Sequence, residues 1–95
     1  MDNLGLIEQK LNQMILNEEM ENATLLVDNL FKSHLGDNQY LLFCKSAYER
    51  LGNTDQVINC LNLLIKNDIK NDRFYHERAM IFMIRVNMAY LKNPY

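Results

Sequence analysis

The sequence predicts an all-α fold, a short stack of antiparallel helix hairpins with about five helices and no strands. Three observations lead to this prediction. Apolar residues recur at steps of three and four along almost the whole 95-residue chain, which is the pattern of amphipathic helices. Three glycines and one proline are fewer than a sheet protein with several tight turns needs. Equivalent apolar positions also recur at a fixed offset, as Met14, Tyr48 and Phe82 do, and this offset is typical of stacked helix hairpins.

The first two helices are expected on either side of a polar cluster at residues 17–22. The apolar stripe of the first consists of Leu4, Ile7, Leu11, Met14 and Ile15. The stripe of the second consists of Ala23, Leu26, Val27, Leu30 and Phe31. Gly36 is expected to close the second helix in the left-handed conformation, and Asp37 is expected to cap the next one.

The third and fourth helices are expected to form the next hairpin. The apolar stripe of the third consists of Tyr40, Leu41, Cys44, Ala47, Tyr48 and Leu51. The stripe of the fourth consists of Val57, Ile58, Leu61, Leu64 and Ile65. Gly52 is expected to end the third helix with a positive φ, and Asn53 or Thr54 to cap the fourth.

The last helix is expected from about Arg73 to Leu91 and is the longest and most apolar. It ends before Pro94, because the residue that precedes a proline resists helical geometry. Residues 79–84 are six apolar residues in a row, and successive helical residues turn by about 100°. This run therefore goes more than once around the helix, so the helix must be covered on more than one side.

The repeat divides the chain into units of about 4–37 and 38–71 and an incomplete unit of 72–95. We expect these units to form a single domain, residues 1–95, that could be the N-terminal part of a longer solenoid. A helix pair cannot bury its apolar face alone, so stacked units share one core. The residues predicted to form this core are Ile7, Met14, Ala23, Val27, Leu41, Tyr48, Val57, Leu61 and Phe82.

Residues 38–71 resemble a divergent tetratricopeptide repeat. That family places a large residue, then a Leu-Gly pair, then Tyr and then Gly on its first helix and turn. The corresponding residues here are Leu41, Cys44-Lys45, Tyr48 and Gly52. Residues 20–65 are similar to the N-terminal tetratricopeptide region of scaffold subunits of the anaphase-promoting complex. This narrower resemblance rests on the runs 22–31 and 40–48 and on the Leu-Gly pair that follows them. It implies a homodimerising segment of a ubiquitin ligase, without catalytic residues of its own, that binds other protein subunits.

Charge and composition argue against several classes of protein. A net charge of −2 does not suit a nucleic-acid binder that relies on a basic surface. No apolar run approaches the roughly 20 residues that a membrane-spanning helix needs. Two cysteines are too few for a disulfide scaffold or a zinc site made of Cys alone, which favours an intracellular protein of the nucleus or cytoplasm.

No catalytic, cofactor-binding or metal site is expected, and no small-molecule substrate. His34 and His76 are the two histidines, and neither has a second ligand at metal-binding spacing. Cys44 lies on an apolar stripe and Cys60 lies next to an apolar residue, so both are expected to be small buried residues. We therefore expect a protein that binds other proteins and is not an enzyme.

The last helix is expected to be the association surface of a homodimer, since symmetric dimers dominate soluble oligomers. If Phe82 faces the core, the opposite side of this helix faces the partner. The expected interface residues are Met80, Ile84 and Met88, then Ile81 and Leu91, with Leu4 and Leu11 contributed by the partner. Residues 1–35 carry a net charge of −4 and residues 66–95 carry +3, so the two ends could complement each other in an assembly.

Two other functions stay open at this stage. One is a generic tetratricopeptide adaptor or a secretion-type chaperone that holds a partner peptide in its groove. The other is a small helical enzyme whose site the sequence does not reveal.

Overall fold

The computed structural model describes residues 4–92, with side chains up to residue 88. Within that range the chain is all-α, as predicted. The helices are α1 (Leu4–Leu16), α2 (Met20–Ser33), α3 (Asn38–Arg50), α4 (Thr54–Asn67) and α5 (Asp72–Lys92). Each packs against its neighbours in sequence, so the core extends along the row of helices.

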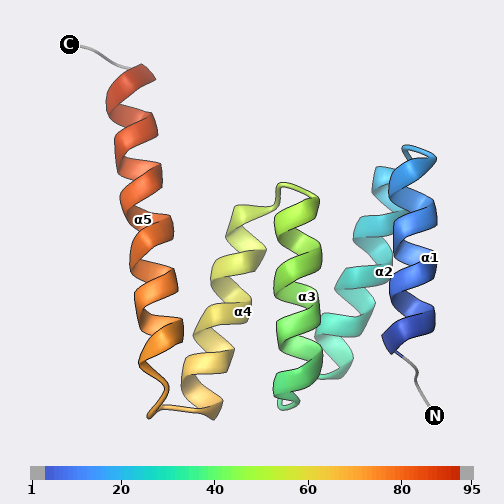
Figure 1. Ribbon diagram of the computed structural model, residues 1–95, viewed down its shortest axis with the longest axis horizontal. Helices are drawn as coiled ribbons and strands as arrows, with labels where there is room; N and C mark the ends of the chain where they lie inside the picture. Colours follow the sequence, from blue (N-terminus) through green and yellow to red (C-terminus); the bar gives the residue numbers. More distant parts are fainter. Residues whose placement is uncertain (1–3, 93–95) are drawn as a thin grey trace.

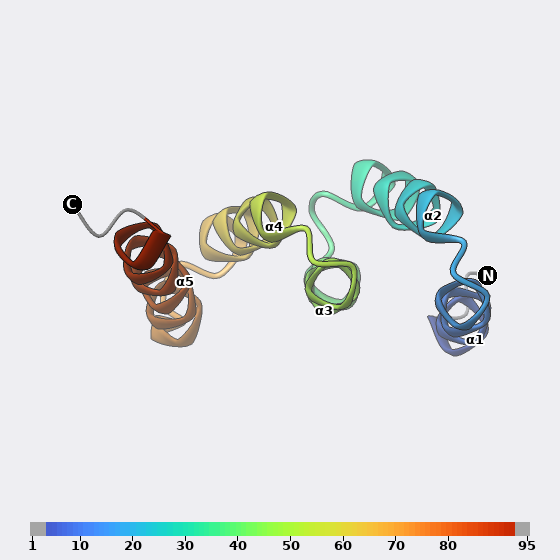
Figure 2. The same ribbon diagram turned by 90° about the horizontal axis from the view of Figure 1, so that it is seen from above.

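The helices stand side by side in one row, and each runs antiparallel to the next (Figure 1). Viewed from above, α1, α3 and α5 lie on one side of the row, whereas α2 and α4 lie on the other (Figure 2). The molecule is correspondingly flat, with principal extents of 51, 37 and 17 Å. The helix α5 is the longest, and its C-terminal part extends beyond α4 (Figure 1).

The repeat predicted from the sequence is present in the structure. The first residues of α1, α3 and α5 are 34 positions apart, and so are those of α2 and α4. The backbone hydrogen bonds of the turns recur at the same offset. Glu19 donates its N–H to the carbonyl oxygen of Met14 (2.8 Å), and Asn53 donates to that of Tyr48 (2.9 Å). The first and second hairpins therefore share the spacing of their helices and the hydrogen bonding of their turns.

Most of the predicted helix ends are confirmed. The Asp37 carboxylate accepts the N–H of Gln39 (3.0 Å), and the Asn53 side chain accepts that of Gln56 (3.2 Å). Gly52 has a φ of 74°, as expected for a left-handed residue that closes α3. The prediction for Gly36 is wrong, because its φ lies outside the left-handed range. The chain turns there through a hydrogen bond from the Asp37 N–H to the carbonyl oxygen of His34. His34 is the residue that caps the C-terminal end of α2.

The predicted core is largely confirmed. Six of its nine members are buried: Ala23, Val27, Leu41, Tyr48, Val57 and Leu61. Ile7 and Met14 are half-buried, because α1 is the first helix of the row and has a neighbour on one side. Phe82 was predicted to be buried by analogy with Tyr48, and this is wrong, since 46% of Phe82 is exposed. Tyr48 lies on α3 between α2 and α4, whereas α5 packs mainly against α4.

A polar contact ties the centre of the core together. The Tyr48 hydroxyl donates a hydrogen bond to the carboxylate of Asp28 on α2. The ring of Tyr48 also meets Phe31 edge to face, with the ring centroids 6.2 Å apart. Burial of Tyr48, together with the Asp28 carboxylate, raises the pKa of its hydroxyl, so the hydroxyl stays protonated and can donate.

Candidate protein-interaction surface

The surface of α5 has three sides with different environments. One side packs against α4 through Phe74, which is buried, and Ile81, which is half-buried against the core. The other two sides also carry large apolar residues, but these are exposed. A helix that is apolar all round is normally buried all round. Two sides of α5 are therefore candidates for contact with another protein.

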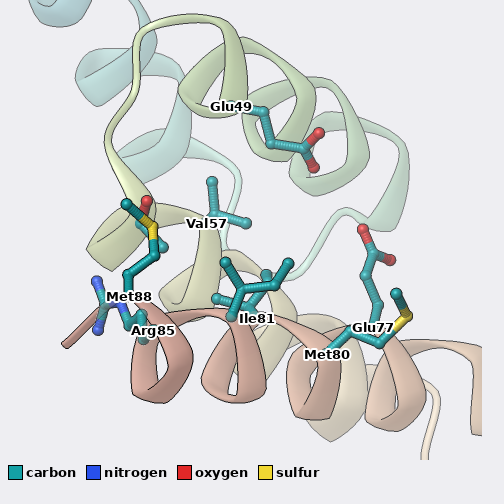
Figure 3. A pocket seen from close by; sticks show the side chains of 9 residues that line it. Glu49, Val57, Glu77, Met80, Ile81, Arg85 and Met88 are labelled. Carbon is teal, nitrogen blue, oxygen red and sulfur yellow. The ribbon is translucent and has the colours of Figure 1, made fainter. Parts of the chain in front are cut away.

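The first exposed side forms one wall of an open groove of about 410 Å³. The residues of α5 that line it include Met80, Ile84 and Met88, and α4 contributes Val57. Val57 and Ile81 point toward one another across the floor of the groove (Figure 3). Glu77 and Met80 lie at one end of the groove, and Arg85 and Met88 lie at the other (Figure 3). The groove is thus apolar in the middle and charged at both ends.

Ion pairs hold α5 beside the second hairpin at both ends of the groove. At one end the Lys45 ammonium on α3 contacts the carboxylates of Glu77 (2.5 Å) and Glu49 (2.9 Å). Burial acts to lower the pKa of Lys45, but its bonds to Glu77 and Glu49 outweigh burial and raise that pKa. At the other end Arg85 pairs with Asp55 on α4 (2.5 Å). An ion pair therefore joins α5 to the second hairpin near each end of the groove.

The second exposed side, which we call the outer face of α5, carries Tyr75, Ala79, Phe82, Met83 and Val86. All five residues are exposed. No helix of the described chain lies on this side of α5 (Figures 1 and 2). The sequence did not predict this side to be exposed, because Phe82 was assigned to the core.

The structure brings together four of the residues predicted for the interface. Met80, Ile84 and Met88 are exposed and line the groove, and Ile81, half-buried against the core, forms part of its floor. The other three are placed differently. Leu4 is half-buried, Leu11 is 1% exposed, and the side chain of Leu91 lies outside the described part. Leu11 is packed into the core of its own chain, so the prediction that it contacts a partner is wrong.

Of the residues considered for chemistry, Cys44, Cys60 and His34 lie on other helices or their ends, whereas His76 is exposed on α5. Cys44 and Cys60 are buried, and burial raises the pKa of the Cys44 thiol to about 11 and that of Cys60 to about 12. The ring of His34 stacks on Tyr40 at 3.6 Å, and its Nδ1 lies 2.9 Å from the carbonyl oxygen of Leu30. Both thiols are protonated at neutral pH and are therefore poor nucleophiles. Among the described side chains, no group of three or more His, Cys, Asp or Glu could hold a metal ion.

Comparisons with protein-family models, curated proteins and solved structures find no significant match to this chain. Across residues 4–92, none of the helices combines the length and the apolar character needed to cross a membrane.

Proposed function

We propose that this chain is a protein–protein interaction scaffold that associates through α5 and performs no chemistry of its own. One observation carries the proposal: α5 leaves large apolar side chains exposed on two of its three sides. Contiguous exposed apolar patches on folded proteins mark interaction sites. Stacked helix hairpins also present extended surfaces of the kind on which partner proteins bind.

The specific form that we propose is a homodimerising tetratricopeptide segment of a ubiquitin-ligase scaffold subunit, as in the anaphase-promoting complex. Two features support it. The offset of 34 positions between equivalent helices equals the tetratricopeptide period. The resemblance to such scaffold subunits covers residues 20–65, which span α2, α3 and most of α4.

A second candidate function is that of an adaptor or chaperone that holds a segment of another protein. The groove favours it, because an apolar floor with charged ends suits an amphipathic helix laid into it. The two functions are compatible, since the groove and the outer face are different sides of α5.

The mass of the protein in solution tests the proposal. Light scattering should give twice the chain mass of 11.3 kDa. The double variant Phe82→Glu with Ile84→Glu places a charge on both exposed sides of α5 and should give the mass of the monomer. Both side chains are about half exposed, so the helical circular dichroism should be retained.

A matched control uses two exposed leucines far from α5. Leu16→Glu with Leu25→Glu adds the same charge at positions that are at least as exposed, and should leave the dimer intact. A wild-type chain that is monomeric at all concentrations would overturn the homodimer. An unchanged mass for the α5 double variant would show that association does not occur through α5.

A further inference from the structure

We propose that two copies of this chain pair through the outer faces of their α5 helices, which run antiparallel about a two-fold axis. This inference rests on the proposed function and assigns the outer face to the second copy, which leaves the groove free for a different partner.

The spacing of the outer face is that of a helix paired along its length with another helix. Tyr75, Ala79, Phe82 and Val86 follow one another at steps of four, three and four residues. This is the a/d seam of a heptad repeat, whose mean spacing of about 3.5 residues keeps the seam facing a partner helix. The exposed fractions are 37% for Tyr75, 46% for Phe82 and 67% for Val86. The chain thus carries a short apolar seam with a/d spacing that the described helices do not cover.

The repeat shows what kind of element covers such a position. Phe82 is the equivalent of Tyr48, one repeat earlier. Tyr48 is fully buried on α3, which has a neighbour on each side, α2 and α4, both running antiparallel to it (Figure 1). An antiparallel helix over Phe82 would therefore reproduce the packing of the second hairpin.

The α5 helix of a second copy fits this position because the seam is complementary to itself. With a two-fold axis midway between Ala79 and Phe82, each Phe82 lies opposite Ala79 of the second copy. In the same register each Tyr75 lies opposite Val86. Both layers then match a large ring with a smaller side chain, which is how facing positions interdigitate without voids. A parallel pair would instead place the two Phe82 rings opposite each other.

The area is sufficient for a dimer of modest affinity. Met83, which is 64% exposed, widens the apolar face beside the seam. The exposed side chains of the outer face amount to roughly 450 Å² per copy, so full contact would bury at most about 900 Å² for two copies, which is the range of weak, transient interfaces. We therefore expect dimerisation to depend on protein concentration.

The charges beside the seam add a signature that distinguishes the second copy from another partner. Arg78 lies four residues before Phe82, and Arg85 lies three residues after it. Both arginines therefore flank the seam on the same edge. They are held toward α4, Arg85 by Asp55 and Arg78 by the side-chain oxygen of Asn62 (2.7 Å). In the two-fold pair these positive edges face each other, so added salt should strengthen dimerisation. A partner helix with acidic edges would be weakened by salt.

Disulfide cross-linking tests the antiparallel register. Tyr75→Cys and Val86→Cys are made as separate variants, mixed and oxidised. The mixture should give a covalent heterodimer, since the two positions face each other across the axis. Val86→Cys alone should not link to itself, because about 11 residues, or about 16 Å along the helices, separate the two copies of this position. Ile84→Cys, in the groove, is the matched control and should not cross-link. Cys44 and Cys60 are buried and should not compete.

Self-linking of Val86→Cys, or linking through Ile84→Cys, would overturn the register. Single variants then separate this inference from the proposed function. Phe82→Glu should give a monomer, and Ile84→Glu should remain a dimer. If Ile84→Glu dissociates the dimer and Phe82→Glu does not, the inference fails but association through α5 stands. If the wild-type chain is a monomer at every concentration, both the inference and the homodimer fail.

Discussion

Glu18 and Gly52 occupy equivalent turns of successive repeats, and both have a left-handed backbone, with φ of 61° and 74°. Each lies two residues after the end of a helix, α1 for Glu18 and α3 for Gly52. Each donates its N–H to the carbonyl three residues earlier, at 3.0 Å for Glu18 and 3.1 Å for Gly52. The turn geometry is therefore a property of the repeat. The first copy maintains it with a residue that has a Cβ, at a cost of about 1–2 kcal/mol.

Replacing Glu18 with Gly should stabilise the fold by about 1 kcal/mol, because glycine removes the strain at positive φ, although its extra freedom in the unfolded chain offsets part of the gain. Denaturant unfolding measures the change. Glu19→Gly is the control, since Glu19 has a φ of −86° and glycine relieves no strain there. Equal effects of the two substitutions would show that Glu18 is not strained.

Gly52→Val should destabilise the protein by about 2 kcal/mol or more, because a β-branched residue strongly resists a positive φ. A Cβ at Gly52 would meet no atom within 4 Å, so the loss would come from the backbone and not from a clash. Gly36→Ala is the control. Gly36 has equally open surroundings but no left-handed φ, so alanine there should be neutral or slightly stabilising. Thermal unfolding compares the two variants with the wild type. An unchanged melting temperature for Gly52→Val would show that the positive φ at this position is not required.

The hairpins and their turns were predictable because their signals are local. An apolar stripe fixes which side of α2, α3 or α4 faces the core, and a polar side chain such as Asp37 or Asn53 marks the first turn of a helix. The cap at Asn71, which accepts the N–H of Arg73 (3.1 Å), follows the same rule and was missed. It stands one full repeat after Asp37, so the repeat could have revealed it.

The orientation of α5 was not predictable in the same way. Its apolar residues surround the helix, so no stripe distinguishes one side. The repeat assigned Phe82 to the core, but burial depends on the elements that lie nearby. Ile81 turned out to face α4. The sequence therefore predicted that α5 carries exposed apolar residues, whereas the structure was needed to separate its groove from its outer face.

Tyr48 should be the most sensitive core position of the second hairpin. Tyr48→Ala removes a fully buried ring and should cost about 3–5 kcal/mol of unfolding free energy. Tyr48→Phe keeps the ring but removes the hydrogen bond to Asp28, and should cost about 1–2 kcal/mol. Denaturant unfolding measures both variants. If Tyr48→Phe had the same free energy of unfolding as the wild type, the hydrogen bond to Asp28 would contribute no net stability.

Stability should fall as the pH rises above about 9. Burial raises the pKa of the Cys44 thiol from 9.0 to about 11 and that of Cys60 from 9.0 to about 12. Above pH 9.0 the unfolded chain thus binds fewer protons than the folded chain, and the free energy of unfolding decreases with pH. The contribution of the two thiols is complete below that pH.

Unfolding measured at pH 9, 10 and 11 checks this prediction, since these values lie between the unfolded and folded pKa values of the thiols. The double variant Cys44→Ala with Cys60→Ala should be less stable at neutral pH, because it leaves small cavities. Its free energy of unfolding should nevertheless fall less steeply with pH than that of the wild type. Part of the slope should remain, because burial also raises the pKa of Tyr48. Equal slopes in the two proteins would rule out the thiols as its source.

Lys45 should contribute more to the attachment of α5 than the other ion pair of the groove does. Its side chain is 12% exposed and contacts Glu77 and Glu49, whereas Arg85 and Asp55 are 43% and 82% exposed. Exposed pairs are worth at most about 1 kcal/mol, since water screens them. Removing a partly buried cation leaves carboxylates without their partner, which costs more.

Lys45→Met keeps the apolar stem of the side chain and removes the charge. It should cost about 1–2 kcal/mol of unfolding free energy, against about 1 kcal/mol or less for Arg85→Met. Hydrogen exchange should show the larger difference in α5, because Lys45 joins α3 to this helix through Glu77. The double variant Lys45→Met with Glu77→Gln should recover part of the loss, since no carboxylate is then left unpaired at that contact. If the double variant were less stable than Lys45→Met alone, the loss would arise from packing and not from the ion pair.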